Sequence, residues 1–198
     1  MPKIVDKEKM KNKILQATLA AFLTHGFHNT SMSKIAQQAD IAKGTLYLYF
    51  DSKEALIQAI AERHFDRLKQ HLMPDKHFPT LDDLLQHIEN ALMISDEESR
   101  FIPVFFEAFG PSFSSETFVK EYQCFFDEIG DFYQACFKSL IDNNEIHSDM
   151  NPDLLGRVFV SMLDGIVLHK GFFKLPQKAH KRMVKEAISL FKRGLKTC

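Results

Sequence analysis

Apolar residues recur at helical spacing along almost the whole chain, and no segment alternates long enough to predict a strand. The pattern predicts an all-α fold with about nine helices. Two short helices are expected between residues 31 and 50, and longer ones at 6–25, 52–72, 80–94, 100–109, 115–142, 151–170 and 176–196. Start signals support several of these, such as Asn151-Pro152-Asp153, which offers a cap, a proline for the first helical position and an acid for the first turn.

The most informative segment covers residues 34–50, where two short helices flank a tight turn. In the second helix, Leu46 and Phe50 share one face and would anchor the helix on its domain. The other faces would present groups suited to phosphates, base edges or close backbone approach: Lys43, Gly44, Thr45, Tyr47, Leu48 and Tyr49. A helix divided in this way is suited to the major groove of DNA.

Flanking residues extend this candidate DNA-binding surface. Lys53 opens the next helix, where the helix dipole would help its charge to hold a phosphate. Ser31 and Ser33 stand at the start of the first helix of the pair, and either Thr30 or Ser31 is expected to cap it. The alternative is an amphipathic pair of helices with no role in DNA binding.

Residues 14–60 resemble the TetR family of bacterial transcriptional regulators. The matching residues are Ala21-Phe22, Gly26-Phe27, Thr30-Ser31-Met32, Ile35-Ala36, Lys43-Gly44-Thr45-Leu46-Tyr47, Tyr49-Phe50, Lys53 and Leu56. Two positions depart from the family pattern. Asp40 replaces a frequent glycine in the turn, and Asp tolerates the left-handed conformation. Ala42 replaces a common capping serine, which should cost about 1 kcal/mol locally.

The resemblance implies a homodimer in which each chain joins a DNA-binding head to a helical domain that binds an effector. We expect residues 1–53 to form a three-helix head with the helix-turn-helix, and residues 54–198 to form the effector-binding and dimerisation domain. The helix at about 52–72 would connect the two. Pro74 and Pro79 bracket the break that follows it.

Charge is unevenly distributed, although the formal net charge is only −1. Residues 1–70 hold 11 Lys and Arg against 7 Asp and Glu, whereas the remainder holds 14 against 19. A basic front and an acidic rear suggest that one end meets a polyanion. Five lysines near the N-terminus form either a solvated face or an arm that contacts DNA: Lys3, Lys7, Lys9, Lys11 and Lys13.

Cysteine usage and hydropathy bear on the compartment. The three cysteines lack a Cys-x-x-Cys spacing, which favours free thiols in a reducing cytosol. The N-terminal residues lack the apolar run of a signal peptide, and the most apolar stretch near the C-terminus, residues 158–168, is too short to span a bilayer. We expect a cytoplasmic protein with no membrane contact, no cofactor and no metal site.

Aromatic residues are concentrated in one part of the rear domain, because ten of the 19 phenylalanines fall between residues 101 and 137. They either fill the core or line a pocket for an apolar effector. The predicted effector-binding residues are Phe101, Phe105, Phe106, Phe109, Tyr122, Phe126, Met162 and Asp164. Other polar candidates for orienting a ligand are His87, Arg100, Glu107 and His169. A buried Asp164 would need a partner.

The last two helices are candidates for dimerisation. Residues 154–168 are apolar almost all round, so this helix must be covered on two sides. We expect a four-helix interface with a second chain that uses Phe159, Ile166, Ile188 and Phe191. The alternative is that both helices are buried within one chain.

These features predict a ligand-responsive, homodimeric transcriptional repressor that a small, largely apolar effector releases from a pseudo-palindromic operator. The alternative is a helical small-molecule-binding protein that has lost DNA binding. No catalytic arrangement of residues supports an enzyme.

Overall fold

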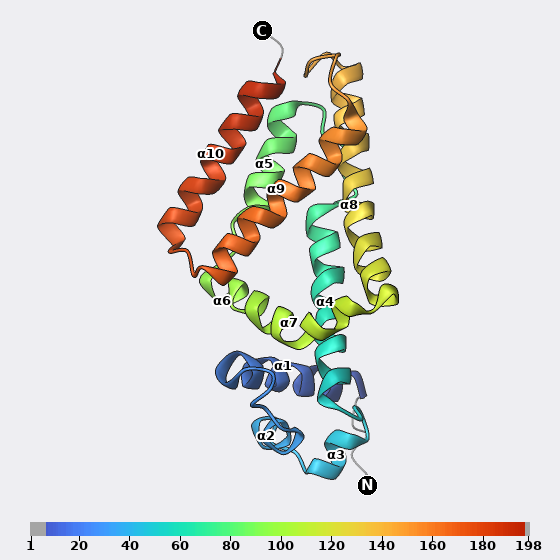
Figure 1. Cartoon of the computed structure of the whole chain (residues 1–198), viewed down its shortest axis with the longest axis vertical. Coiled ribbons are helices and arrows are strands. Elements are labelled where there is room, and N and C mark those ends of the chain that lie inside the picture. The colour runs from blue at the N-terminus through green and yellow to red at the C-terminus, as the bar shows by residue number, and fades with distance from the viewer. Residues whose placement is uncertain (1–6, 197–198) are drawn as a thin grey trace. The chain divides into compact units, whose positions relative to one another are not determined.

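The computed structural model describes residues 7–196, and it is all-α (Figure 1). In chain order the elements are α1 (Lys7–His25), α2 (Met32–Gln38), α3 (Lys43–Tyr47), α4 (Lys53–Leu72), α5 (Leu81–Leu92), α6 (Asp96–Ser99), α7 (Phe101–Phe109), the 3-10 turn η1 (Gly110–Ser114), α8 (Glu116–Asp142), α9 (Pro152–Phe172) and α10 (Gln177–Leu195). Each predicted helix has a counterpart. The short α6 and η1 are additions, and both are too brief to give a periodic signal.

Caps set several helix starts where the sequence predicted them. The side chain of Asn151 accepts hydrogen bonds from the backbone N–H groups of Asp153 and Leu154, and Pro152 opens α9. Thr80 and Ser115 cap α5 and α8 in the same way. These side chains satisfy N–H groups that have no partner within the helix.

The chain forms two compact units. The first contains residues 7–67 and 103–111, and the second contains residues 68–102 and 112–196. Both α4 and α7 therefore begin in one unit and end in the other. The functional boundary between residues 53 and 54 stays a prediction.

The first unit is built on α1–α3, the first part of α4 and most of α7. Ile14, Phe22, Ile35 and Leu46 are fully buried and form its core. Gly26 ends α1 with φ 81°, a conformation that glycine adopts without strain.

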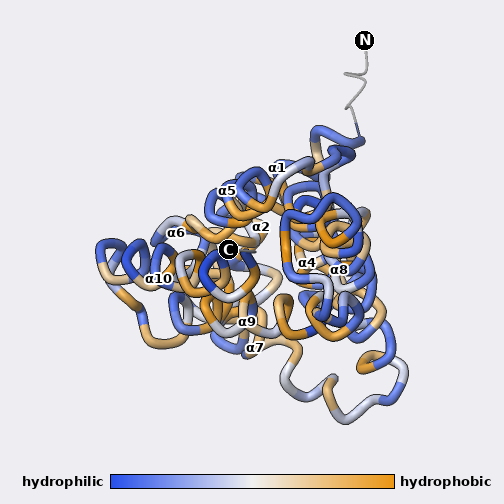
Figure 2. The backbone as a smooth tube through the Cα atoms, turned by 90° about the horizontal axis from the view of Figure 1, so that it is seen from above, coloured by the Kyte–Doolittle hydropathy of each residue, from blue (hydrophilic) through white to orange (hydrophobic). Residues whose placement is uncertain are grey.

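The second unit packs α8 along α9, and α10 against α5 and α9. Along these helices, hydrophilic and hydrophobic positions alternate with the helical turn (Figure 2). The fully buried Phe159 of α9 contacts the rings of Tyr133 and Phe137 from α8, and of Phe191 from α10. The hydroxyl of Tyr133 donates a 3.0 Å hydrogen bond to the Leu72 carbonyl, which fixes the end of α4 on α8.

No helix within residues 7–196 is both long and apolar enough to cross a membrane.

Candidate DNA-binding surface and effector cavity

The recognition helix α3 divides its residues between core and surface as predicted. Leu46 is fully buried, and Phe50, just after the helix, is half-buried. Tyr47 and Leu48 are adjacent in the chain and are 43% and 83% exposed. Lys43, Gly44 and the half-buried Thr45 and Tyr49 complete this part of the surface.

The turn between α2 and α3 contains Asp40 and Ala42, the two residues that depart from the family pattern, and both behave as expected. Asp40 adopts φ 49°, the left-handed conformation that Asp tolerates. Ala42 precedes α3 without a side-chain cap. Position 42 therefore leaves the first N–H groups of the recognition helix without a side-chain acceptor from the cap.

Ser31 caps α2, and Thr30 does not. The backbone N–H of Lys34 donates to the hydroxyl of Ser31, whereas Thr30 is buried and donates its own hydroxyl to the Gly26 carbonyl at 2.7 Å. Ser31 and Ser33 are both exposed at the start of α2, the helix that precedes α3. Ser31 therefore combines a local capping role with its predicted contact to DNA.

Lys53 has intramolecular partners that the sequence did not reveal. Its Nζ donates to the carbonyl oxygens of Phe27 and His28 at 3.0 and 3.3 Å, and it lies 4.4 Å from the centre of the Phe27 ring. An ammonium group has three N–H donors, so one stays available for a phosphate.

Four of the five N-terminal lysines belong to α1, and Lys3 lies outside the described residues. Lys7 and Lys9 are exposed, and Lys11 lies 3.8 Å from Glu8. Lys13 reaches toward the turn before α3, where its Nζ donates to the Asp40 carbonyl at 3.4 Å.

The predicted effector-binding residues are divided between the two units. Phe105, Phe106 and Phe109 belong to the first unit, where the Phe105 ring packs against Phe65 and Phe109. Phe101, Tyr122, Phe126, Met162 and Asp164 belong to the second unit. Within it, Tyr122 contacts Phe126 at a centroid distance of 4.8 Å.

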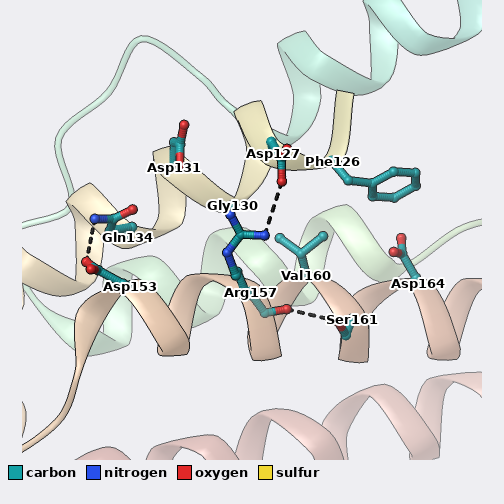
Figure 3. A pocket seen from close by; sticks show the side chains of 10 residues that line it. All are labelled: Phe126, Asp127, Gly130, Asp131, Gln134, Asp153, Arg157, Val160, Ser161 and Asp164. Atoms are coloured by element: carbon teal, nitrogen blue, oxygen red, sulfur yellow. Dashed lines mark hydrogen bonds and ion pairs between the residues drawn. The ribbon is translucent and has the colours of Figure 1, made fainter. Parts of the chain in front are cut away.

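A cavity of about 220 Å³ lies between α8 and α9 (Figure 3). Its lining residues are Phe126, Asp127, Gly130, Asp131, Gln134, Asp153, Arg157, Val160, Ser161 and Asp164. Only two predicted residues, Phe126 and Asp164, are among them. The acidic lining was missed because its members are spread over α8 and α9, and each resembles an ordinary surface residue in the sequence.

Charges in this cavity are partly paired. Arg157 binds Asp127 at 3.2 Å in the middle of the cavity, and Gln134 binds Asp153 at the end away from Phe126 (Figure 3). Asp164 lies at the Phe126 end, and no described residue forms a hydrogen bond or ion pair with it. Burial raises the pKa of Asp164 to about 7, because no nearby positive charge stabilises the carboxylate. The partner expected for a buried Asp164 is therefore missing.

Residues 14–60 match the family model described as bacterial regulatory proteins of the tetR family. This match covers the helix-turn-helix and the exposed face of α3. The head of this chain therefore carries the DNA-binding domain of the TetR family. The chain is a transcriptional regulator and not an enzyme.

Similarity to known transcriptional regulators extends beyond the head. The chain is 28% identical over 190 residues to YvdT, an uncharacterized HTH-type transcriptional regulator of Bacillus subtilis. This alignment covers 93% of this chain and 94% of YvdT. It is 44% identical over 62 residues to the HTH-type transcriptional repressor KstR of Rhodococcus jostii, and this alignment covers 31% of this chain and 29% of KstR. A solved complex of SmeT with triclosan has the same fold, with a TM-score of 0.74, 19% identity and coverage of 96% and 92%.

The four predicted dimer residues differ in exposure, and their role in a dimer stays a prediction. Phe159 is fully buried within the chain, and Ile166 is 7% exposed. Ile188 and Phe191 are half-buried. The exposed apolar residues of the same helices are Leu154, Val158 and Phe172 of α9 and Leu190 of α10.

Proposed function

We propose that this TetR-family regulator is a homodimeric repressor that reads a pseudo-palindromic operator and leaves it when a small molecule binds. The observation that carries the proposal is the recognition helix. Leu46 anchors it while Tyr47 and Leu48 stay open to solvent. In a head of this size, such exposure is best explained by a partner that covers these side chains, and Lys43 beside them favours a polyanion.

The proposed dimer uses the outer face of α9. Leu154, Val158 and Phe172 follow one another at helical spacing, and they are 61%, 60% and 44% exposed. An apolar stripe of this kind is stabilised when a second chain covers it. Two such chains would present two recognition helices about one helical turn of DNA apart.

Repression and effector release are supported by relatives. KstR is named a repressor, and SmeT binds triclosan. We place the effector of this chain in the cavity between α8 and α9, with its apolar part against Phe126. The unpaired Asp164 and the other carboxylates favour an effector that also carries a positive charge.

The DNA-binding proposal is tested with a duplex taken from upstream of the protein's own gene. A mobility shift should show binding that is tighter than to a scrambled duplex at the same salt concentration. Footprinting should then show two protected half-sites about one helical turn apart. Failure to bind this duplex or any genomic fragment would favour the alternative, a small-molecule-binding protein that has lost DNA binding.

The effector proposal is tested by thermal shift with two probes. A benzyl quaternary ammonium ion, which has an aromatic ring and a positive charge, should raise the melting temperature more than neutral triclosan. Replacing Phe126 with alanine should reduce this shift. An equal or larger shift with triclosan would contradict the positive charge of the effector.

A further inference from the structure

The last helix, α10, concentrates the positive charge of the rear part of the chain. Residues 174–196 hold eight Lys and Arg against one acidic residue, whereas residues 71–173 hold six against 18. Four of these basic side chains are exposed near the start of α10, and we call them the basic stripe: Lys178, Lys181, Arg182 and Lys185. The rear of the chain is otherwise acidic, and it therefore presents one strongly basic surface.

The basic stripe occupies one side of its helix and belongs entirely to the second unit. Successive residues of a helix are turned by about 100°, so the four side chains fall within a sector about 100° wide. The buried His180 and Val184 lie outside this sector, because they belong to the side of α10 that packs against α5 and α9 (Figure 1). The basic stripe is therefore open to a partner while the rest of the helix holds the unit together.

Charge pairing separates the basic stripe from the other end of α10. There, Nζ of Lys192 lies 2.7 Å from a carboxylate oxygen of Asp82 in α5, and Arg193 lies 3.3 Å from Glu186. Within residues 7–196, no acidic side chain forms an ion pair with a member of the basic stripe. The positive charge of the stripe is therefore not compensated by that part of the chain.

The basic stripe also opposes the stability of its own helix. Cations are unfavourable near the start of a helix, where the helix dipole is positive, and the first turn of α10 contains Lys178 and no acidic residue. Lysine and arginine four residues apart repel each other across one turn, as Lys178 and Arg182 do. Pro176 precedes the helix and offers no side-chain cap. A negatively charged partner would offset all three effects.

The composition of the stripe favours nucleic acid over a protein or a membrane. Protein–protein interfaces are depleted of lysine, whereas protein–DNA interfaces are strongly positive. A helix that binds lipid buries its apolar face in the bilayer surface, but the apolar face of α10 is packed against α5 and α9. Leu190, an exposed apolar residue of α10, lies about 130° around the helix from the centre of the stripe.

We propose that the basic stripe is a second DNA-binding surface, which holds the phosphate backbone of duplex DNA without reading its sequence. Lysine suits this role because it is a flexible point charge that contacts phosphate but lacks the rigid fork of arginine. Contacts of this kind supply sequence-independent affinity, which keeps a regulator on DNA away from its operator. The inference goes beyond the proposed function and does not rest on it, because the stripe and the recognition helix belong to different units.

The first test measures how fast an amine-reactive reagent acylates each lysine of the full chain, with mass spectrometry as the readout. At about 50 mM salt, a scrambled duplex should slow acylation of the stripe by about threefold or more at Lys178, Lys181 and Lys185. The controls are exposed lysines of the same unit outside α10, whose rates should not change: Lys76, Lys120 and Lys138.

Two results of this test would overturn the proposal. One is that the duplex leaves the acylation of the stripe unchanged. The other is that anionic phospholipid vesicles or poly-glutamate protect the stripe as strongly as the duplex does, because the partner would then be a membrane or any acidic polymer.

The second test removes the charge of the stripe with glutamine, which has a similar helix propensity to lysine. The stripe variant combines Lys178→Gln, Lys181→Gln and Lys185→Gln. Its affinity for the scrambled duplex should fall by about tenfold at about 50 mM salt, and the slope of log affinity against log salt should become shallower by about 2–3. Circular dichroism checks that the helices are intact.

The matched control removes the same charge from the same unit through Lys76→Gln, Lys120→Gln and Lys138→Gln. It should bind the scrambled duplex nearly as tightly as the wild type, with the same salt slope. Equal losses in the two variants would overturn the proposal, because net charge would then explain them. If the wild type binds upstream and scrambled duplexes equally, the operator proposal fails, while the acylation rates still decide whether the stripe binds DNA.

Discussion

Gly156 of α9 lies against Gly130 of α8 with no room for a side chain between the two helices. A Cβ added at Gly156 would be 2.5 Å from the Gly130 carbonyl oxygen and 3.0 Å from the Gln134 backbone nitrogen. These neighbours are backbone atoms of a helix, so they cannot rotate away. The close approach fixes the spacing of α8 and α9, and with it the cavity between them.

Gly156→Ala should therefore destabilise the protein by about 2–4 kcal/mol, because α9 must move away from α8. Chemical denaturation measures the change. Gly194→Ala is the matched control, since it adds the same methyl group to α10 with no atom within 4 Å. Equal stability of the two variants would show that the helices can separate freely.

Tyr47→Ala should weaken specific binding to the operator by about tenfold or more, because Tyr47 is on the exposed face of α3 and contributes no buried core. Fluorescence anisotropy with the upstream duplex measures the affinity, and circular dichroism checks the fold. Tyr47→Phe separates the roles of the ring and the hydroxyl. Unchanged affinity in Tyr47→Ala would place the DNA-reading helix elsewhere.

Val158→Lys should weaken self-association by about tenfold or more, because it would bury an unpaired charge between two α9 helices. Analytical ultracentrifugation measures the dimer. Val119→Lys is the control, as Val119 is also exposed, at 40%, but lies on α8. If both variants stay equally dimeric, the interface does not include this part of α9.

Asp164→Asn should stabilise the protein at alkaline pH. In the folded protein the pKa of Asp164 is raised to about 7 by burial, whereas its ordinary value is 3.8. Between these two pH values the folded state keeps a proton that the unfolded state has already lost. The free energy of unfolding therefore falls as the pH rises through this range. The variant avoids this loss and should gain on the order of 2 kcal/mol at pH 8, after a discount for solvent in the cavity, and almost nothing at pH 3.5.

Denaturation at the two pH values checks this prediction. Asp131→Asn is the control, since Asp131 lines the same cavity but is exposed. A gain in Asp164→Asn that does not depend on pH would mean that burial of the charge is not its cause.

Local signals were sufficient where one short segment decides the structure. Asn151 and Ser115 start their helices as predicted because a cap acts on N–H groups only two or three residues away. The face of α3 that carries Tyr47 followed from the position of its anchor Leu46. The effector and dimer residues depend on which of several apolar faces meets which neighbour, and helical spacing does not specify this.

The sequence by itself determined most of the helices, several of their caps and the similarity of the head to the TetR family, because these depend on residues close together in the chain. Tertiary structure alone decided that Phe159 is buried within the chain, that carboxylates from α8 and α9 surround one cavity, and that Glu107 binds the backbone of His28, 79 residues away. The physical reason is that packing between distant helices selects one arrangement among many with the same helical pattern.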